Sequence, residues 1–289
     1  MSKLIMLSGL PASGKSTRAK EIVSNGGNWV RVNRDLLRTM LHFDKWSGRN
    51  EGTTVEIEKV IAATALANGY NVVVDDTNLN PKNKDMWKSV ADVVGAEFVH
   101  EKIETSYFEC AIRDSSRANS VGHHVIIGMA LQYGLYPRPE KGFVLCDLDG
   151  TLCNIDHRLH HVKGPTKDWK SFFAGIPDDK LNIPTLDLIS EFQNQGYQIV
   201  FVSARPEDYR GETSLWLNKN IAPWIQWNII IMRKKGDKRP DTEVKQEIFN
   251  TYFKDKYPIH KVIDDRPSVI RMWRSNNLDV IDVGKGVEF

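Results

Sequence analysis

Short apolar runs rich in β-branched residues alternate along the chain with longer amphipathic stretches. This alternation is typical of α/β units, in which helices cover a parallel sheet. The strands predicted in the first half are residues 4–8, 29–32, 71–74 and 97–99. Helices are predicted at residues 53–68, with Thr53 or Thr54 as the N-cap, and at residues 121–133, and a glycine follows each of them.

A turn-forming segment separates the two halves. Residues 136–142 hold two prolines, one glycine and three charged side chains, which is typical of a linker. A buried strand is predicted directly after it, followed by four more, at residues 143–146, 198–202, 228–232, 260–263 and 279–283. The pattern therefore predicts two α/β domains, residues 1–138 and residues 142–289.

Composition supports this division and narrows the class of protein. A length of 289 residues suits two domains, and 41% apolar with 26% charged residues is typical of a globular protein. The net charge of +2 neither requires nor excludes a nucleic-acid partner. Three cysteines without a CxxC pair argue against disulfides or structural zinc. Because we find no signal peptide and no apolar run that would span a bilayer, we expect a cytoplasmic protein without membrane contacts.

Residues 9–16 match the pattern GxxxxGK[ST] between a predicted strand and a predicted helix. That context is typical of a P-loop, whose backbone N–H groups surround phosphate oxygens at a helix N-terminus. Lys15 is expected to reach the β- and γ-phosphates of ATP, and the Ser16 hydroxyl is expected to bind Mg²⁺. The expected nucleotide contacts are Gly9, Ser13, Gly14, Lys15, Ser16 and Thr17.

Charged residues after the next strands indicate a kinase. Asp35 follows the second strand, where a carboxylate can accept a proton from an attacking hydroxyl, and Arg38 lies one helical turn further on. The alternatives are a helix N-cap for Asp35 and a solvated position for Arg38. Asp75 and Asp76 follow the third strand. One interpretation is an acidic group near the metal, as in a Walker B motif, and the alternative is an Asx-turn that leads into the next helix.

Arg113 and Arg117 are four residues apart and are predicted to share one helix face. Two arginines near the nucleotide would stabilise the transferring phosphate. The alternative is an ordinary solvated pair.

The second half carries the sequence Asp147-Leu-Asp149-Gly-Thr directly after its first strand. This motif resembles the haloacid-dehalogenase-type phosphatases, and the resemblance implies that Asp147 is the nucleophile and Asp149 the acid and base. Later motifs in the same order support it, namely Ser203 and Arg205, Asp241 and Lys245, and Asp264 and Asp265. The implied Mg²⁺ ligands are Asp147, Asp149, Asp264 and Asp265.

Histidines lie between the first two of these motifs, at positions 157, 160 and 161. We interpret them as surface or cap residues in preference to a metal site, and Arg158 as a contact for substrate phosphate. Residues 154–184 are longer than the family pattern, which leaves the substrate preference of this half open.

Together the two halves resemble the bacteriophage-type polynucleotide kinase–3′-phosphatases. The resemblance covers nearly the whole chain and implies a P-loop NTPase-type parallel sheet followed by a haloacid-dehalogenase-type Rossmann-like domain. It implies transfer of the ATP γ-phosphate to 5′-hydroxyl ends of DNA or RNA and removal of 3′-phosphates, with 2′,3′-cyclic phosphates as a further candidate, upstream of a nucleic-acid ligase. The substrate contacts that it implies are Asp35, Arg38, Asp76, Arg158 and Arg233.

Two other functions remain open from the sequence. A small-molecule kinase fused to a small-molecule phosphatase would share the P-loop chemistry, and an end-binding scaffold would have lost its catalytic acids, which are present here. The basic run at residues 233–239 is either a polynucleotide contact or a solvated loop. The sequence leaves the choice of DNA or RNA open, and also whether the protein is a monomer or a homo-oligomer.

Overall fold

The computed structural model describes residues 1–163 and 165–286. The chain folds as two compact units, of which the first is Met1–Leu135 and the second begins at Tyr136. Tyr136 falls in the segment predicted as a linker, yet it is buried. Its ring lies against Phe143 at 6.2 Å and Tyr257 at 6.5 Å, so it packs with the second unit.

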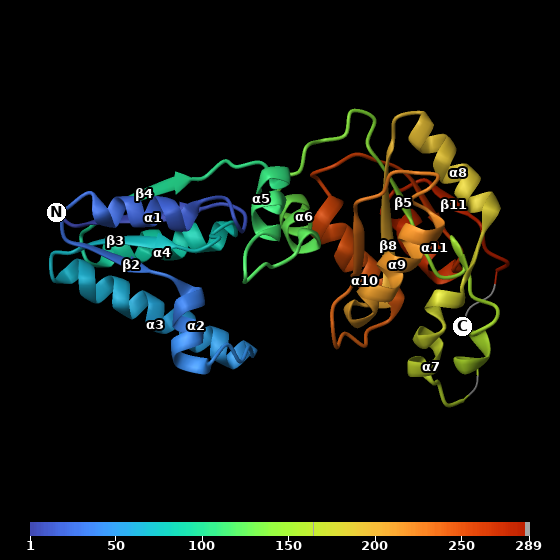
Figure 1. Ribbon diagram of the computed structural model, residues 1–289, viewed down its shortest axis with the longest axis horizontal. Coiled ribbons are helices and arrows are strands. Elements are labelled where there is room, and N and C mark those ends of the chain that lie inside the picture. The colour runs from blue at the N-terminus through green and yellow to red at the C-terminus, as the bar shows by residue number, and fades with distance from the viewer. Residues whose placement is uncertain (164, 287–289) are drawn as a thin grey trace. The chain divides into compact units, whose positions relative to one another are not determined.

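The first unit is built on a four-stranded parallel sheet, as predicted. Its order is β2-β3-β1-β4, and all three pairings are parallel (Figure 1). The strands are β1 Lys3–Ser8, β2 Trp29–Val32, β3 Asn71–Asp75 and β4 Glu97–Lys102. Each strand predicted for this half is confirmed.

Helices cover both faces of this sheet because side chains alternate along its strands. Leu7 and Val73 pack on α1, whereas Met6 and Val74 belong to the cluster that includes Trp87 of α4. The helices are α1 Lys15–Ser24, α2 Arg34–His42, α3 Gly48–Ala67, α4 Pro81–Val93, α5 Tyr107–Ser115 and α6 His123–Gln132.

The expected start of α3 was wrong. The helix begins at Gly48, and Ser47 is its N-cap, with the Ser47 hydroxyl accepting from Asn50 N at 3.1 Å. The Thr53 hydroxyl instead donates to Arg49 O within the helix. The first turn carries no apolar periodicity, so the sequence pattern did not reveal it.

The second unit is built on a five-stranded parallel sheet in the order β11-β10-β5-β8-β9. The strands predicted for this half are confirmed. They are β5 Phe143–Cys146, β8 Gln198–Pro206, β9 Ile230–Arg233, β10 Ile259–Asp264 and β11 Val280–Asp282. A two-stranded antiparallel pair is added by β6 Cys153–Asn154 and β7 Lys180–Leu181.

Helices of the second unit also pack on the sheet. Leu186 and Ile189 of α8 and Trp216 of α9 share a buried cluster with Cys146 and Phe201. The helices are α7 Trp169–Ala174, α8 Ile183–Asn194, α9 Arg210–Asn220, α10 Asp241–Ile248 and α11 Pro267–Ser275, with short turns η1 Leu159–His161, η2 Ile176–Asp178 and η3 Glu207–Tyr209 and the π-helical turn η4 Phe249–Phe253.

The parallel direction of the strands places the candidate catalytic residues of each unit at one edge of its sheet. In parallel sheets the carboxyl ends of the strands meet at the same edge, where α/β proteins bind ligands. The P-loop follows β1 in the first unit, and Asp147 follows β5 in the second. No helix among the described residues is long and apolar enough to cross a bilayer.

Candidate active sites

The loop between β1 and α1 has the geometry of a phosphate-binding loop. Gly14 lies at the N-cap of α1 with φ 104°, a left-handed conformation that glycine adopts at no steric cost. The Lys15 Nζ turns back into the loop and donates to Gly9 O at 3.0 Å and to Leu10 O at 2.6 Å. Burial lowers the pKa of Lys15, and this effect is opposed by the negative charges of Asp75 and Asp76.

The remaining P-loop residues occupy two environments. Ser13 is buried, and its hydroxyl accepts from Lys15 Nζ at 3.4 Å. Ser16 and Thr17 are exposed on the first turn of α1. Their hydroxyls are therefore open to solvent beside the N-terminus of the helix, where the partial positive charge attracts anions.

Asp35 and Arg38 lie together on α2. The helix is capped by Asn33, whose side chain accepts from Leu36 N, so the alternative of Asp35 as the N-cap is wrong. The Asp35 side chain is 84% exposed and forms an ion pair with Arg38. Arg38 also donates from two nitrogens to Glu51 of α3, at 2.7 and 2.8 Å.

Asp75 and Asp76 end β3 in different environments. Asp75 is buried and pairs with Arg31 of β2. The Asp76 carboxylate accepts from Arg34 N at 2.9 Å, and thereby joins β3 to the start of α2. Each carboxylate keeps one buried oxygen without a hydrogen-bond donor in the described structure, Asp75 Oδ1 and Asp76 Oδ2.

A buried glutamate that the sequence analysis missed faces Asp76. Glu58 of α3 is fully buried, and its Oε2 accepts from Arg34 at 2.8 and 3.0 Å. Burial, and then hydrogen bonding to Asp76, raise the pKa of Glu58 to about 9. Glu58 Oε1 and Asp76 Oδ2 both lack a donor in the described structure, so a proton shared between the two carboxyl groups would satisfy both.

The expectation that Arg113 and Arg117 share a helix face was wrong. Helix α5 ends at Ser115, so Arg117 lies beyond it, where it pairs with the buried Asp114 at 3.5 Å. Arg113 remains on α5 beside the P-loop, since a β-carbon added at Gly14 would lie 3.9 Å from its Nη1. The positive charge of Arg117 adds to the burial that lowers the pKa of Lys15.

In the second unit, three carboxylates gather around one lysine. Asp147, Asp264 and Asp265 are buried side chains whose oxygens lie within 4.8 Å of one another. Lys245 of α10 contacts Asp147 Oδ1 at 2.7 Å and Asp264 Oδ2 at 2.8 Å. Burial, reinforced by Asp264, raises the pKa of Asp147 to about 8 although Lys245 opposes the shift. Burial likewise raises the pKa of Asp265 to about 6.

The turn after Asp147 needs a glycine. Gly150 has φ 86°, and a β-carbon there would lie 2.1 Å from Asp265 Oδ2. The next residue, Thr151, donates from its hydroxyl to Asp265 Oδ1 at 2.9 Å. The glycine therefore lets the loop approach the end of β10 closely enough to bring Asp147 beside Asp265.

Asp149 belongs to a different cluster from Asp147. Arg205 donates to its two oxygens at 3.0 and 2.6 Å, and Arg158 forms a second ion pair with it. Asp179, a fully buried carboxylate that carries no motif, accepts from both arginines, at 2.6 Å from Arg158 and at 2.8 Å from Arg205. Burial opposes ionisation, but the two guanidinium groups hold the pKa of Asp149 well below its usual range.

This arrangement separates the Asp149 side chain from the other expected metal ligands of this unit. The Asp149 carboxylate faces Arg158 and Arg205 and is not part of the carboxylate group formed by Asp147, Asp264 and Asp265. The DxDGT spacing places both carboxylates near the end of β5, but Asp147 pairs with Lys245 whereas Asp149 pairs with Arg158 and Arg205.

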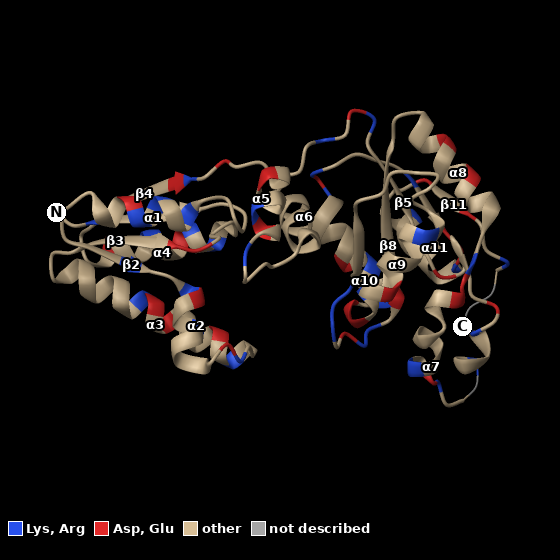
Figure 2. Ribbon diagram, viewed as in Figure 1, with Lys and Arg blue, Asp and Glu red and all other residues tan. Residues whose placement is uncertain are grey.

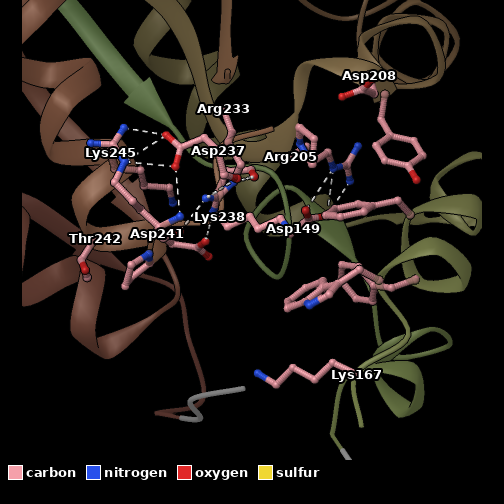
Figure 3. A pocket seen from close by; sticks show the side chains of 18 of the residues that line it. Asp149, Lys167, Arg205, Asp208, Arg233, Asp237, Lys238, Asp241, Thr242 and Lys245 are labelled. Atoms are coloured by element: carbon pink, nitrogen blue, oxygen red, sulfur yellow. Dashed lines mark hydrogen bonds and ion pairs between the residues drawn. The ribbon is translucent and has the colours of Figure 1, made fainter. Parts of the chain in front are cut away.

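A cavity of about 1110 Å³ opens in front of these clusters. Asp147, Asp149, Arg205 and Lys245 line it (Figure 3). Arg233 also lines it but is largely engaged with protein groups, because it donates to Ala204 O at 2.7 Å and Arg239 O at 2.6 Å and pairs with Asp241.

Ser203 lies deeper than expected. It is buried on β8, its hydroxyl accepts from Arg205 N at 3.2 Å, and it does not line the cavity. The histidines of the long segment do not line the cavity either, although His157 Nε2 lies 3.7 Å from Asp179 Oδ1. His157 contacts Gly175 O at 3.3 Å, and the rings of His160 and His161 are 3.9 Å apart.

Comparison with known families decides the identity of the second unit. A model of the polynucleotide kinase PNKP phosphatase domain matches residues 141–288, more than half of the chain. The chain belongs to this polynucleotide kinase phosphatase family. A second model, described as an AAA domain, matches residues 4–130. The first unit is thus the kinase domain, and the second unit is the haloacid-dehalogenase-like phosphatase domain.

Two related proteins match over nearly the whole of this chain. The chain is 26% identical over 316 residues to the "Putative bifunctional polynucleotide kinase/RNA ligase" of Autographa californica nuclear polyhedrosis virus. The match covers 96% of this chain but only 42% of that relative. The solved Pnkp1/Rnl/Hen1 RNA repair complex contains a chain with 26% identity and a TM-score of 0.44, with 99% of this chain and 97% of that chain covered.

A third likeness concerns the phosphatase domain alone. A haloacid dehalogenase-like hydrolase from Streptococcus pneumoniae, SP0104, is 14% identical with a TM-score of 0.34. That likeness covers 51% of this chain and 87% of the hydrolase.

Proposed function

We propose that this polynucleotide kinase phosphatase family member is a bifunctional enzyme that repairs nucleic-acid ends. Its kinase domain transfers the ATP γ-phosphate to a 5′-hydroxyl end of DNA or RNA, and its phosphatase domain removes a 3′-phosphate. The observation that supports the proposal is that each domain by itself carries charged groups suited to phosphoryl transfer. The first has Lys15 and Asp35, and the second has Asp147 and Asp149 in one cavity.

Asp147 acts as the nucleophile of the phosphatase domain. Its carboxylate attacks phosphorus, the bond from phosphorus to O3′ breaks, and Asp149 gives a proton to O3′. Water then attacks the aspartyl-phosphate and returns a proton to Asp149, which releases inorganic phosphate and Asp147. Lys245, already 2.7 Å from Asp147, neutralises charge in both steps.

Asp149 acquires its acidic proton only when substrate arrives. Without substrate, Arg158 and Arg205 keep its pKa well below the usual range. Arg158, expected from the sequence to contact the phosphate, is buried and does not line the cavity. Arg205 lines the cavity, so a bound phosphate attracts its guanidinium group and weakens its hold on Asp149. The pKa of Asp149 then rises toward the range in which a carboxyl group can donate.

The carboxylate cluster fits a divalent cation. Three carboxylates face the single ammonium group of Lys245, so the fully ionised cluster carries two uncompensated negative charges. Oxygen-only donors are those that Mg²⁺ prefers. Asp147, Asp264 and Asp265 would hold the ion, which supplies charge stabilisation to the transferring phosphoryl group.

In the kinase domain, Asp35 is the general base. It removes the proton of the 5′-hydroxyl, the oxygen attacks the γ-phosphorus, and ADP leaves. Triphosphate oxygens replace the carbonyl oxygens of Gly9 and Leu10 as partners of Lys15, and Arg113 approaches from α5. Ser16 is the hydroxyl available for Mg²⁺ beside the triphosphate.

One oligonucleotide tests both activities. We expect a single strand with a 5′-hydroxyl and a 3′-phosphate, incubated with ATP and Mg²⁺, to gain a 5′-phosphate and lose its 3′-phosphate. The product ends suit a nucleic-acid ligase, which is the partner that we propose downstream. Hydrolysis of the strand's 3′-phosphate without any 5′-phosphorylation, or the reverse, would remove one half of the proposal.

A small-molecule kinase fused to a small-molecule phosphatase is the second candidate. The match to the polynucleotide kinase phosphatase family argues against it. Transfer of the γ-phosphate to a free nucleoside as efficiently as to the oligonucleotide would favour it. The cytoplasmic location stays a prediction. The same assay with a DNA strand and an RNA strand decides the choice between the two substrates.

A further inference from the structure

One wall of the phosphatase cavity is aromatic. Trp169, Phe172 and Phe173 of α7 line it together with Tyr209 of η3, and charged residues of the loop before α10 line the same cavity. Trp169 stacks on Phe173 with ring centroids 5.9 Å apart and an interplanar angle of 22°, and Phe173 lies 4.8 Å from Tyr209. The three rings form a continuous row on the cavity wall.

Trp169 is the accessible member of this row. Phe172 and Phe173 are buried, whereas Trp169 is 45% exposed at the first residue of α7. An aromatic residue that only completes a core would be expected to be buried as its two neighbours are. The indole instead keeps much of its surface open inside a cavity that also contains the nucleophile.

The wall is fixed relative to the catalytic groups. The Arg158 guanidinium lies over the Phe172 ring at 4.2 Å and donates to Phe172 O at 3.3 Å, while the same guanidinium pairs with Asp149. At the start of α7, the Asp168 side chain accepts from Ser171 N at 3.0 Å. The position of the aromatic row therefore follows the position of the acid that serves the leaving group.

Positive charge accompanies the row. Lys167 and Lys170 are exposed and line the cavity beside Trp169, and Lys167 Nζ lies 5.4 Å from the indole ring. In Figure 3 the Lys167 side chain points into the cavity from the wall that faces Asp241. Aromatic rings with adjacent cations are the combination that holds single-stranded nucleic acid, since bases stack on the rings and phosphates meet the cations.

We propose that Trp169, supported by Phe173, is the stacking platform for the base of the 3′-terminal nucleotide, and that Lys167 contacts the phosphate on the 5′ side of that nucleotide. This inference rests on the proposed 3′-phosphatase function and specifies its substrate as an end whose last base is unpaired. A paired base would have to leave its helix to reach the ring.

The test compares two single strands that differ in one base. Both carry a 3′-phosphate, and one of them lacks the base of its 3′-terminal nucleotide. For the wild-type chain we expect the abasic strand to have a KM about tenfold higher, equivalent to about 1.4 kcal/mol, with kcat changed less than threefold.

Three variants locate the effect. Trp169→Ala is expected to raise KM about tenfold for the strand with the base and to leave KM for the abasic strand unchanged, and Trp169→Phe is expected to recover most of the affinity. The matched control is Trp224→Ala, since Trp224 is also exposed, at 69%, but does not line the cavity. It should behave as wild type on both strands.

Two results would overturn the inference alone. One is equal KM values of the wild type for both strands, and the other is a Trp169→Ala variant that loses kcat equally on both, which would indicate a role only in the fold of α7. A wild-type chain that hydrolyses neither strand but hydrolyses a small phosphate ester would overturn the proposed 3′-phosphatase function itself.

Discussion

The two active sites differ in how their charged groups are held. In the phosphatase domain Arg158, Arg205 and Asp179 are each at most 1% exposed as side chains, and they form a closed network around Asp149. In the kinase domain Asp35 stands on one helix with its side chain 84% exposed. The first site is preorganised by burial, whereas the second is open to its acceptor.

The difference has a physical reason. Buried ions need partners, so the phosphatase network is fixed before the substrate binds, and the substrate must compete for Arg205. An exposed carboxylate keeps its solvation and needs no such network. The comparison therefore predicts that the phosphatase domain loses more stability than the kinase domain when one charged partner is removed.

The largest expected effect is at Asp147, the proposed nucleophile of the phosphatase domain. Asp147→Asn replaces the attacking carboxylate with an amide, so 3′-dephosphorylation should fall at least about a thousandfold while 5′-phosphorylation stays near wild type. Both ends of the same oligonucleotide are followed in one reaction. Retention of most phosphatase activity would rule out the covalent mechanism.

Asp35→Ala should do the reverse with a smaller loss. Removal of the general base should lower 5′-phosphorylation by about a hundredfold, and the phosphatase reaction should be unchanged. Lys15→Ala serves as a parallel variant in the nucleotide site. If either variant, shown to be folded, lost both activities equally, the assignment of separate sites would fail.

Two matched truncations test the stability difference directly. Asp179→Ala leaves two buried arginines short of a partner and should destabilise the phosphatase domain by about 3 kcal/mol. Glu51→Ala removes the partner of the half-exposed Arg38 and should cost the kinase domain about 1 kcal/mol or less. Hydrogen exchange of peptides from each domain separates the two effects, and equal losses would contradict the comparison.

Glu58 provides an exception within the kinase domain, because it is buried with a raised pKa of about 9. The folded state thus binds this proton more tightly than the unfolded state, whose pKa is near the ordinary 4.5. The stability due to Glu58 is full below about pH 4.5 and is lost as the pH rises toward 9.

Glu58→Gln tests this reading, because the amide can still accept from Arg34 and donate to Asp76. Between about pH 6 and pH 9, within the range over which the proton of Glu58 is lost, we expect the unfolding free energy of the variant to fall less than that of the wild type. Hydrogen exchange of α3 peptides measures this difference. Identical pH profiles would mean that Glu58 is ionised in the folded protein.

The smallest expected effect concerns the basic run at residues 233–239. Acidic residues lie among its cations (Figure 2), and Lys234 pairs with Glu247 and Lys235 with Asp208. Within residues 1–163 and 165–286, Lys238 is the one lysine of the run without an ion pair, and it lines the cavity.

Lys238→Ala should therefore reduce the slope of log affinity against log salt by about 0.7 for a single-stranded oligonucleotide. Lys235→Ala is the matched control and should change the slope less, because its ammonium is already compensated. A larger change for Lys235→Ala than for Lys238→Ala would show that the ion pairs open on binding.

Local sequence determined the strands and the catalytic motifs that follow them. Short β-branched runs predicted the strands of both sheets, and a motif at a strand's carboxyl end is brought to the active edge by the parallel arrangement itself. The need for glycine at positions 14 and 150 could also be predicted, because both residues adopt a positive φ in the turns beside Lys15 and after Asp147.

Only the tertiary structure decided which side chains meet. Asp179 and Glu58 belong to no sequence motif. Their importance shows only in their arginine partners, which folding brings to them from 26 positions away for Asp179 and Arg205 and from 24 positions away for Glu58 and Arg34. Likewise, helical spacing suggested a shared face for Arg113 and Arg117, but the helix ends between them. Sequence patterns describe neighbours along the chain, whereas pairing, burial and cavity walls depend on distances that arise only when the chain packs.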